Sequence, residues 1–537
     1  MTERITILPV FGRKTDVPAD DMSLIVPVSE GVFMTHDVGG VNFDLSRTRQ
    51  CCTKSEGDIL WSNSANAQAT LALGLFELYD GTNRNHLFVD NGKVYYFDSS
   101  LNPQDISGSV TFAKDIGDLY SFIKVGDYAV WADRGETTPY KWKHADAAAS
   151  KLIASGTEYL FRYLMSFQRR VIGVYTTETD GDISIRWSSA WPTTAITALN
   201  FPAANQLYVP NDDPIVGGRT FGNDRAFIYC EDSINELVYY SDYAAPFRCY
   251  VKVPKQGAIN HQSIISLGQK HYFFNKNYGF CGYAGGQDIS EIISQDIEKD
   301  IINIDADYYA NIVGTYLPFI KKLVWAVPMG GSSTNTYLWF YDIANKQWTI
   351  EDKIAYFVDM WRMYDSYTWN DLITAMQAAG YANPTWTNLR TWKGASVRWG
   401  DLVNVYQRMV YANTDGKLYY KSGESAGTGN IDGYRIEPIL GLAGKHVRTK
   451  LQEIWMDLKG VGNFDIDVYH RSGSTVGEIE AESWTLLGSI SANSPEYPRL
   501  LCDKSDFLHQ IKWRTNLNAE KFEVPAIHLY FTREGQY

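Results

Sequence analysis

A short β-hairpin unit recurs along the chain and limits the possible folds more than any other feature. The unit is an apolar strand, a tight Asp/Asn/Gly turn and a second strand rich in tyrosine. It is clearest as HLFVDNGKVYYFD at 86–98 and MVYANTDGKLYYKSG at 409–423, and it returns in looser form at 226–242. The Asn-Gly pair at 91–92 and the Asp-Gly pair at 415–416 favour type I′ turns, in which both central residues take a positive φ. These segments are predicted to be β-hairpins.

Further strand pairs lie between these hairpins at a roughly regular spacing. Three pairs of predicted turns, at Gly126 and Gly181, at Asp232 and Gly279, and at Gly279 and Gly331, are each separated by roughly 50 residues. The blades of β-propellers are four-stranded antiparallel sheets that recur about every 40–50 residues. The spacing therefore predicts an all-β fold built around a β-propeller with irregular blades, and it leaves about five to seven blades open.

The composition agrees with a large, strand-rich globular protein. Aromatic residues make up 14% of the 537 residues, with 36 Tyr and 16 Trp, and these side chains favour the half-buried surface of a sheet. The length is enough for about two to four domains or one large repeat array. No apolar run is long enough for a membrane-spanning helix, and we expect none. The first residues lack the pattern of a secretory signal, so we expect the chain to fold in a cytosol.

Three regions differ in their strand patterns. Residues 1–50 hold short strand-like pieces and are predicted to be an N-terminal arm with the first strands. The recurring hairpins predict a propeller over 51–435. In 436–537 longer strands alternate apolar and polar side chains with period two, as in FDIDVYH and AIHLYFT. This last region is predicted to be a C-terminal β-sandwich.

A small helical insertion is predicted within the propeller, at about 360–408. Its helix would cover 366–381, where Trp369 and Leu372 belong to a set of apolar residues at helical spacing. Gly380 follows this set and is a favourable residue just beyond a helix C-terminus.

The charge balance limits the ways in which the protein could meet nucleic acid. The chain has 62 acidic and 49 basic residues and a net charge of −13. A protein that grips nucleic acid through its phosphates needs a basic surface. We therefore expect no tight binding to nucleic acid, whereas an acidic wall would repel DNA and let it slide past.

The cysteines and histidines show no pattern of a reactive or metal site. The six cysteines lack the spacing of a disulfide scaffold or a zinc site, and the adjacent Cys51 and Cys52 are expected to face opposite sides of a strand. His261 and His271 are expected to be surface or packed residues rather than ligands. No G-x-S-x-G elbow or P-loop is present, and GGRTFG at 217–222 is interpreted as a turn where backbones approach closely.

Acidic residues beside turns leave two binding chemistries open. Asp180, Asp182, Asp212 and Asp213 could coordinate calcium, or a carboxylate pair could hydrolyse glycosides. Aspartate is also a common turn residue because its side chain hydrogen-bonds the nearby backbone, and we favour this local role. The Asp-boxes of sialidases, S-x-D-x-G-x-x-W, are absent. We assign no catalytic, cofactor-binding or metal residues, expect no cofactor, and do not expect an enzyme.

One stretch changes from strand to helix over a short length of chain. FFNKNYGFCGYAGGQDISEIISQDIEKDI, at 273–301, begins as an aromatic strand, breaks at glycines and ends as a short charged segment. Ser294 is the expected helix N-cap, and Asp296 would complement the positive end of the helix dipole. Ile297 and Ile301 are spaced at about one helical turn and would dock the helix through one face. We expect a helix that closes the propeller.

The order of these segments resembles a known family. The strand FIYCEDSINELVYY, the blade SIISLGQKHYFFNKNYGFCGYAGG, the helix ISEIISQDIEKDI and the closing strand AIHLYFTREG occur in this order along the chain. They are similar to the β-propeller tail proteins of tailed bacteriophages, namely the packaged-DNA stabilisation (tail hub) family of short-tailed phages and the related tail nozzle proteins. The resemblance runs from about residue 30 to the end and lends no catalytic residues.

The resemblance implies a structural protein of the phage virion. Such a protein forms a ring, usually a hexamer, below the portal and adaptor proteins and near the tail fibre or spike proteins. The ring would form the DNA channel, retain the packaged double-stranded DNA and conduct it during ejection. The chain would be made in the host cytoplasm and act in the virion tail. Six copies would carry about −78, so DNA would pass without tight binding.

A carbohydrate-binding or glycan-active β-propeller is the alternative. Such a protein would use Trp and Tyr at the mouth of the propeller to stack on a glycan. The absent Asp-boxes and the absence of a convergent carboxylate pair speak against it.

Overall fold

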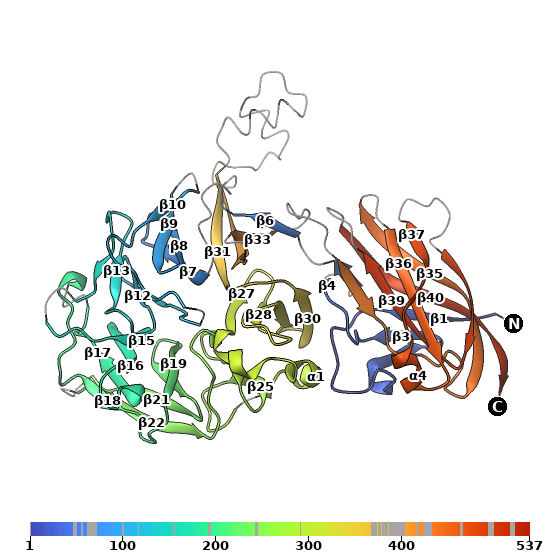
Figure 1. Ribbon diagram of the computed structural model, residues 1–537, viewed down its shortest axis with the longest axis horizontal. Helices are drawn as coiled ribbons and strands as arrows, with labels where there is room; N and C mark the ends of the chain where they lie inside the picture. The colour runs from blue at the N-terminus through green and yellow to red at the C-terminus, as the bar shows by residue number, and fades with distance from the viewer. Residues whose placement is uncertain are drawn as a thin grey trace.

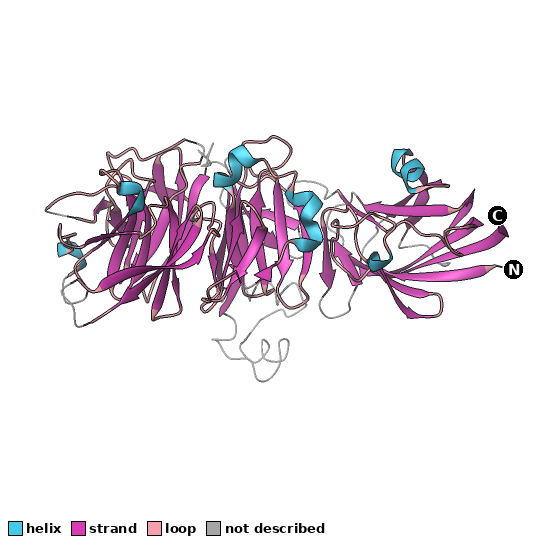
Figure 2. Ribbon diagram, turned by 90° about the horizontal axis from the view of Figure 1, so that it is seen from below, coloured by secondary structure: helices cyan, strands magenta, loops and turns pink. Residues whose placement is uncertain are grey.

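The protein consists of a β-propeller and a β-sandwich that lie side by side along the longest axis of the molecule (Figure 1). The computed structural model describes residues 2–46, 51–54, 57–61, 72–98, 101–115, 117–153, 156–191, 195–241, 245–289, 291–366, 403–414, 417–422, 432–461, 465–491, 499–515 and 521–536, with the single residues 373, 377 and 385. Both ends of the chain lie on the side of the sandwich that faces away from the propeller (Figures 1 and 2).

Seven four-stranded antiparallel sheets form the propeller within these described residues. The innermost strands of consecutive blades adjoin one another, and β31 lies against β7, so the ring is closed. The predicted all-β fold with an irregular propeller is confirmed, and the number of blades is at the upper limit of the predicted range. The blades are, from the innermost to the outermost strand, β7 (Ala72–Tyr79), β8 (Arg84–Asp90), β9 (Lys93–Phe97) and β10 (Pro103–Asp105); β11 (Ser121–Val125), β12 (Tyr128–Ala132), β13 (Tyr140–Trp142) and β14 (Ser150–Lys151); β15 (Phe161–Phe167), β16 (Arg170–Thr176), β17 (Ser184–Trp187) and β18 (Gln206–Tyr208); β19 (Ile215–Phe221), β20 (Arg225–Cys230), β21 (Ser233–Tyr239) and β22 (Phe247–Pro254); β23 (Ile265–Ser266), β24 (His271–Asn275), β25 (Gly279–Tyr283) and β26 (Glu291–Ile292); β27 (Val313–Leu317), β28 (Lys322–Val327), β29 (Tyr337–Asp342) and β30 (Gln347–Asp352); and β31 (Phe357–Ser366), β32 (Val403–Ala412), β33 (Leu418–Ser422) and β6 (Gly57–Leu60).

The predicted hairpins form consecutive strands of these blades. Asn91 and Gly92, between β8 and β9, both have positive φ, at 45° and 73°, as a type I′ turn requires. The segment at 226–242 forms the β20–β21 hairpin. The Asp-Gly pair at 415–416 lies outside the described residues, but β32 and β33 on either side of it are paired as predicted.

Large aromatic side chains hold neighbouring blades together. Between blades five and six, Phe280 packs against Trp325, Trp339 and Trp348, with ring centroids 4.5–5.8 Å apart, and all four are buried. The Trp348 indole nitrogen donates to the Ile293 carbonyl at 2.7 Å, so this buried polar group is satisfied. Part of the high aromatic content of the sequence therefore lies between the blades.

The sandwich is built from both ends of the chain. An eight-stranded sheet contains strands from the N-terminal segment that ends at Lys54 and from the C-terminal region, and a four-stranded sheet packs on it. The first sheet comprises β1 (Glu3–Leu8), β2 (Ile25–Ser29), β3 (Val32–Thr35), β4 (Phe43–Ser46), β5 (Cys51–Lys54), β35 (Val447–Val461), β38 (Arg499–Asp506) and β40 (Lys521–Gln536), and the second comprises β34 (Gly433–Ile436), β39 (Leu508–Thr515), β36 (Asp465–Gly473) and β37 (Thr485–Ser491).

These pairings change the predicted domain limits. Residues 1–50 were expected to be a separate arm, but β1 pairs with β40, and Ile7 and Phe43 lie in the same core as Ile454 and Trp513. Strand β5, predicted as the first part of the propeller, also belongs to the sandwich sheet. The reason is that strands pair wherever apolar faces can be buried together, regardless of separation in the chain.

The predicted insertion at 360–408 coincides partly with two long strands. Strand β31 continues to Ser366, and β32 begins at Val403, with Phe357 to Ser366 pairing antiparallel to Val403 to Ala412. The ends of the predicted insertion are therefore part of blade seven. Within the predicted helix at 366–381, Ser366 is the last residue of β31, and Ile373 and Gln377 are helical. The other residues of this range, including Trp369, Leu372 and Gly380, lie outside the described residues.

The described helices are short and lie in the connections between strands. Helix α4 begins with a capping box in which the Thr475 hydroxyl accepts from the Glu478 amide, and the Glu478 carboxylate accepts from the Thr475 amide. The helical segments are the 3₁₀ turns Met22–Leu24, Gly181–Ile183, Ile196–Ala198, Gln295–Ile297 and Ala306–Asn311, and the α-helices α1 (Glu298–Ile301) and α4 (Val476–Ala481).

Candidate functional site

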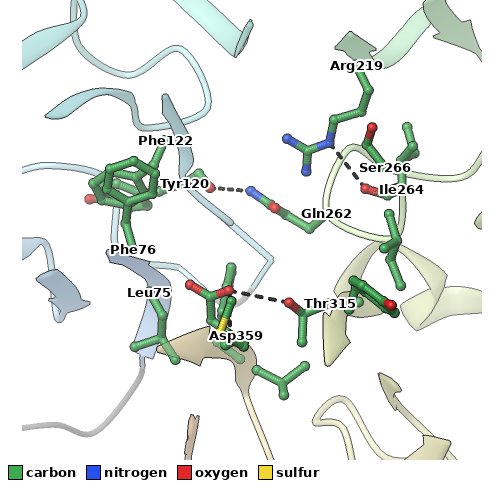
Figure 3. Close-up of a pocket in the computed structure, with 16 residues that line it drawn as sticks. Leu75, Phe76, Tyr120, Phe122, Arg219, Gln262, Ile264, Ser266, Thr315 and Asp359 are labelled. Atoms are coloured by element: carbon green, nitrogen blue, oxygen red, sulfur yellow. Dashed lines mark hydrogen bonds between the residues drawn. The ribbon is translucent and has the colours of Figure 1, made fainter. Parts of the chain in front are cut away.

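The innermost strands enclose a cavity of about 340 Å³ at the centre of the propeller (Figure 3). Residues from β7, β11, β19, β23, β27 and β31 and their adjoining loops line it, so six of the seven blades contribute. We call this space the central cavity. Its lining residues are Leu75, Phe76, Tyr120, Phe122, Arg219, Gln262, Ile264, Ile265, Ser266, Gly314, Thr315, Tyr316, Phe357, Val358, Asp359 and Met360.

Arg219 on β19 brings a positive charge into the central cavity. Its Nε donates to the Ile264 carbonyl at 3.2 Å and its Nη2 to the His261 carbonyl at 3.2 Å, which fixes the guanidinium against the segment before β23. Surrounding protein atoms lower the pKa of Arg219 to about 10 because they replace water around the charge. The group remains a cation at neutral pH.

Asp359 on β31 brings a carboxyl group into the same cavity. One carboxyl oxygen accepts from the Met360 amide at 2.8 Å and, at 3.4 Å, from the Thr315 hydroxyl. Burial raises the pKa of Asp359 to about 7, and the nearby Glu77 carboxylate adds to this rise. No acidic oxygen of the described residues, including Asp359, lies within 4.0 Å of the Arg219 guanidinium.

The cavity also has an apolar wall. Phe76 on β7 and Phe122 on β11 stack with ring centroids 5.3 Å apart and an interplanar angle of 12°. Figure 3 shows these rings with Tyr120 on one side of the cavity and Arg219 on the other. The Gln262 side-chain amide donates to the Tyr120 carbonyl and thereby links blades two and five. The central cavity thus combines a charged region with an aromatic one.

His261 and Ser121 lie beside this cavity and act as a link between blades. His261 Nδ1 accepts from the Gly218 amide at 3.3 Å, so Nε2 carries the proton and faces the Ser121 hydroxyl at 3.2 Å. Burial lowers the pKa of His261 well below its ordinary value, and Arg219 lowers it further. An imidazole in this tautomer cannot take a proton from Ser121, so the pair does not form an activated nucleophile.

The other residues considered from the sequence have local roles. His271 is buried between the Tyr229 hydroxyl at 2.8 Å and the Thr220 carbonyl at 2.9 Å, so both of these histidines are packed residues rather than surface ones. Most of the segment at 217–222 belongs to the inner strand β19, and only Gly222, with a positive φ of 64°, lies in the turn that was predicted. Close backbone approach is confirmed there, because a Cβ on Gly217 would lie 2.8 Å from the His261 Cα.

The acidic turn residues do not form one cluster. Asp213 accepts from the Asp232 amide at 3.1 Å and from the Ser233 hydroxyl at 2.6 Å. Its side chain therefore holds the neighbouring β20–β21 hairpin, and the local role expected of Asp213 is wrong. Asp180 and Asp212 sit at positive φ, at 56° and 50°. Across the described residues, no group of three or more His, Cys, Asp or Glu side chains is placed to hold a metal ion.

The cysteines are dispersed as the sequence suggested. Cys52, Cys230, Cys281 and Cys502 are buried free thiols, and Cys249 is half-buried. Burial raises the pKa of Cys249 to about 12, and the same cause raises the pKa of the other four. Cys51 and Cys52 were predicted to face opposite sides of a strand. The side chain of Cys51 lies outside the described residues, so this stays a prediction.

A second charged cluster lies where the sandwich meets the propeller. Arg13 Nε and Nη2 donate to the two carboxylate oxygens of Asp300 at 2.7 and 2.6 Å. Thr15 Oγ1 donates to Asp300 at 2.8 Å, and Lys14 Nζ donates to Asp296 at 2.7 Å. We call this set of side chains the interdomain clip. They join the chain between β1 and β2 to the helical segment at 295–301.

The clip explains the charged end of the stretch at 273–301. Ile297 is fully buried and Ile301 packs against the same core, so the predicted docking face is confirmed. Ser294 occupies the N-cap position, but its hydroxyl accepts from the Phe280 amide at 3.0 Å and caps no helical amide. The predicted capping bond is therefore wrong, because the adjacent strand β25 competes for the hydroxyl. The helix serves the contact with the N-terminal segment.

Sequence reasoning missed both charged residues of the central cavity. Arg219 lies within the GGRTFG segment that had been noted only for its glycines, and Asp359 lies immediately before the predicted insertion. A charged residue in an inner strand looks like any solvent-facing strand residue in sequence. The signal that could identify them is their position in the first strand of a blade, which requires the blade boundaries.

The comparisons with known proteins concern the fold. No helix among the described residues is both long and apolar enough to cross a membrane. No family model matches the chain, and no curated protein matches it. Among solved structures, the chain is similar to the crystal structure of the WD40 β-propeller domain of Doa1, with 7% sequence identity and a TM-score of 0.36 over 69% of this chain and 97% of that chain. The assignment of this chain as a β-propeller with an added β-sandwich rests on its own sheets.

Proposed function

We propose that the protein is a structural component of a bacteriophage tail, a hub or nozzle ring below the portal and adaptor that conducts DNA during ejection. The observation that carries the proposal is the position of residues 226–301 in the fold. Three of the four segments on which the family resemblance rests follow one another closely along the chain: the β20–β21 hairpin, blade five, and the helical segment that holds the N-terminal chain. The fourth, AIHLYFTREG, lies in β40 of the sandwich. This gives the resemblance a structural basis, since three of its segments form one continuous part of the molecule.

The size of the central cavity bears on where DNA could pass. Its volume is about 340 Å³, which is the size of a small-molecule site. The major groove of B-form DNA alone is about 12 Å wide. In the proposed ring, the DNA channel is therefore the lumen between copies of the chain and not the centre of one propeller.

The charge of the chain fits such a lumen. At −13 per copy, six copies would carry about −78, and a surface of this sign repels phosphate at distances near the Debye length of about 8–10 Å. The interdomain clip would hold the two bodies of each copy at one angle, which a ring requires of its subunits.

The test is identification of the chain in purified virion tails, followed by cryo-electron microscopy of those tails. We expect a ring of copies around an axial lumen, and native mass spectrometry of the released ring should give about 365 kDa for six copies of the 60.8 kDa chain. Empty capsid fractions without tails serve as the control. Tails that lack the chain, or that contain it only away from the axis, contradict the proposal.

A second candidate function rests on exposed tyrosines. Tyr208 on β18 and Tyr250 on β22 are 46% and 45% exposed, and they lie on the outermost strands of blades three and four, which adjoin each other. Exposed aromatic rings can stack on sugars, but these two lie at the outer edge of the propeller and not at its mouth, where the alternative of a carbohydrate-binding propeller placed them. A glycan array probed with the wild-type chain and with Tyr250→Ala tests this role, and equal or absent signals for the two proteins exclude it.

A further inference from the structure

The central cavity holds a cation whose hydrogen bonding is incomplete. A guanidinium has five N–H donors, and Arg219 uses one on Nε and one on Nη2, both to backbone carbonyls. Its Nη1 has no acceptor among the described residues. The open donors of Nη1 and Nη2 lie side by side on the guanidinium, in the arrangement that receives the two oxygens of a carboxylate.

Asp359 does not fill this role. The two side chains line the same cavity but form no ion pair within 4.0 Å, and one carboxyl oxygen of Asp359 is held by the Met360 amide. Its raised pKa means that much of this group is protonated at neutral pH, which makes it a weak counter-ion. Arg219 is partly buried and has no counter-ion within 4.0 Å among the described residues, so an anion that enters the cavity gains a strong interaction.

The rest of the cavity selects among anions. Opposite Arg219 lie the stacked rings of Phe76 and Phe122, with Leu75 on the same strand as Phe76 (Figure 3). The volume of about 340 Å³ is at the lower end of the range of small-molecule sites, about 300–1,000 Å³. Inorganic ions would leave the aromatic wall without contacts, whereas a molecule with a flat apolar body would use it.

We infer that the central cavity binds a small organic carboxylate, with the carboxylate on the open edge of Arg219 and an aromatic or aliphatic body against Phe76 and Phe122. This site is independent of the proposed role in a phage tail, since it lies inside each propeller and needs no second copy. Gln262 and Ser266, which also line the cavity, supply polar groups near the charged end.

Asp359 makes the binding depend on pH. When this carboxyl group loses its proton, a negative charge appears in the same cavity and repels the ligand, so affinity falls as the pH rises through about 7. The charged groups that act on Asp359 are Arg219 from β19 and Glu77 from β7. Burial raises the pKa of Glu77, but bonds from His86 and the Arg362 amide lower it by more, so Glu77 stays ionised across this range.

The remaining polar side chains that line the cavity are phenols, hydroxyls and one amide. Tyr120 on β11 has its pKa raised by burial, and its hydroxyl donates to the Ala113 carbonyl at 2.7 Å. Tyr316 on β27 is the other phenol among the lining residues, and Thr315 beside it is a neutral hydroxyl that donates to Asp359. A change in ligand affinity near neutral pH therefore measures the protonation of Asp359.

The test is calorimetric titration of the full chain with benzoate and with benzamide, which has nearly the same shape and no charge. We expect one benzoate site per chain and at least tenfold weaker binding of benzamide, since a hydrogen bond to a charged group contributes about 1.5–3 kcal/mol and about 1.4 kcal/mol corresponds to tenfold. Equal binding of the two compounds, or no binding of benzoate at millimolar concentration, overturns the inference. Binding of inorganic phosphate without benzoate overturns the ligand class.

Two variants and a matched control separate the site from general effects of charge. Arg219→Gln should weaken benzoate binding about tenfold or more. Arg248→Gln removes the same charge from the exposed outer strand of the same blade and should leave the affinity unchanged. Asp359→Asn should tighten binding at about pH 8 and abolish its pH dependence. This gain of affinity cannot come from misfolding, so equal affinity and pH dependence in Asp359→Asn and wild type would contradict the inference even if Arg219→Gln fails to fold.

Discussion

The propeller and the sandwich bury their sheets in different ways. In blades one to six each strand pairs with its neighbour in sequence, from β7 in the first blade to β30 in the sixth. In the sandwich the central partners come from opposite ends of the chain, with Glu3 opposite Phe531 in the β1–β40 pair. The propeller is thus mostly an array of local hairpins, whereas the sandwich depends on the two termini meeting.

One blade of the propeller shares the property of the sandwich. Blade seven takes its outer strand, β6, from the N-terminal part of the chain and pairs it with β33, so that Gly57 lies opposite Ser422. Asp58 on β6 is buried between Lys421 on β33 and Lys353, and Lys421 also contacts Glu351 at 2.5 Å. In each body, strands from the N-terminal part of the chain complete a sheet whose other strands come from much later in the sequence. All of these N-terminal strands precede Trp61.

The largest expected effects come from removing a buried tryptophan in each body. Trp513→Ala in the sandwich removes a ring that packs on Phe43 at 4.7 Å and donates to Glu437 at 3.1 Å. Trp142→Ala in the propeller removes a ring that packs on Tyr96 at 4.9 Å. Each change should lower the free energy of unfolding of its own body by about 3–5 kcal/mol. Calorimetry with hydrogen-exchange mass spectrometry measures this body by body.

The two variants should differ in which amides lose protection. Trp513→Ala should expose β1 and β40 together, because they pair, while the hairpins of blades one to six stay protected. Equal loss of protection in both bodies for either variant would show that the molecule unfolds as one unit, and the comparison would fail.

Removing a buried carboxylate should destabilise the propeller more where the ring closes than in a similar ion cluster within one blade. Asp58→Ala leaves Lys421 and Lys353 without a shared carboxylate in a buried position and should destabilise the propeller by about 3 kcal/mol or more. Glu236 on β21 is placed likewise between Arg225 on β20 and Lys252 on β22. Glu236→Ala is the matched control.

The control should cost less because its strands are tethered. The β20–β21 and β21–β22 pairs join consecutive strands, so short loops keep these strands close together even when the ion cluster is weakened. Strand β6 meets β33 only when the ring closes, and no short loop holds the two together. Urea titration followed by intrinsic fluorescence compares the two. A larger effect of Glu236→Ala would contradict a dominant role of ring closure, because the Glu236 side chain is also the more exposed of the two, at 12% against 2% for Asp58.

The same contrast explains what the sequence could predict. The Asn91–Gly92 turn and the alternation in β36 are local signals, and both were interpreted correctly as a hairpin and a sandwich strand. The pairing of β6 with β33 joins segments from distant parts of the chain, and a strand as short as Gly57–Leu60 carries no mark of its partner. Sequence reasoning missed Arg219 and Asp359 for the same reason, because these two residues line one cavity only when the ring of blades is closed.

The interdomain clip should have a smaller effect than either closure. Arg13→Ala removes two bonds to Asp300 and one to the Gly40 carbonyl at 2.7 Å, all in partly buried positions. We expect a loss of about 1.5–3 kcal/mol in the coupling between the two bodies, since these bonds involve charged groups. Limited proteolysis near residues 11–17 and the separation of the two calorimetric transitions measure it. Lys151→Ala, in an ion pair with Glu158 whose side chains are 47% and 42% exposed, is the control and should leave the stability nearly unchanged, because water screens an exposed ion pair.

The smallest effects should come from pH, and they should have opposite signs in the two bodies. Asp359 has a folded pKa of about 7, above its unfolded value, so its contribution to propeller stability falls as the pH rises from about 4 to about 7. His470 in the sandwich lies against His509 at 3.0 Å, and burial lowers its folded pKa to about 3. Its contribution is present above about pH 6.5 and is lost as the pH falls towards 3.

Variants isolate these two groups from the buried His261 and His271, which make the propeller respond to acid like the sandwich. Asp359→Asn should be close to wild type at about pH 5 and should stabilise the propeller by about 1–2 kcal/mol at about pH 8, where the wild-type carboxylate is charged. His470→Gln should destabilise the sandwich most at about pH 8 and progressively less as the pH falls, because wild type then loses the stability that a neutral His470 contributes. Thermal unfolding at three pH values measures both trends, and parallel curves for the two variants would mean that these groups do not distinguish the two bodies.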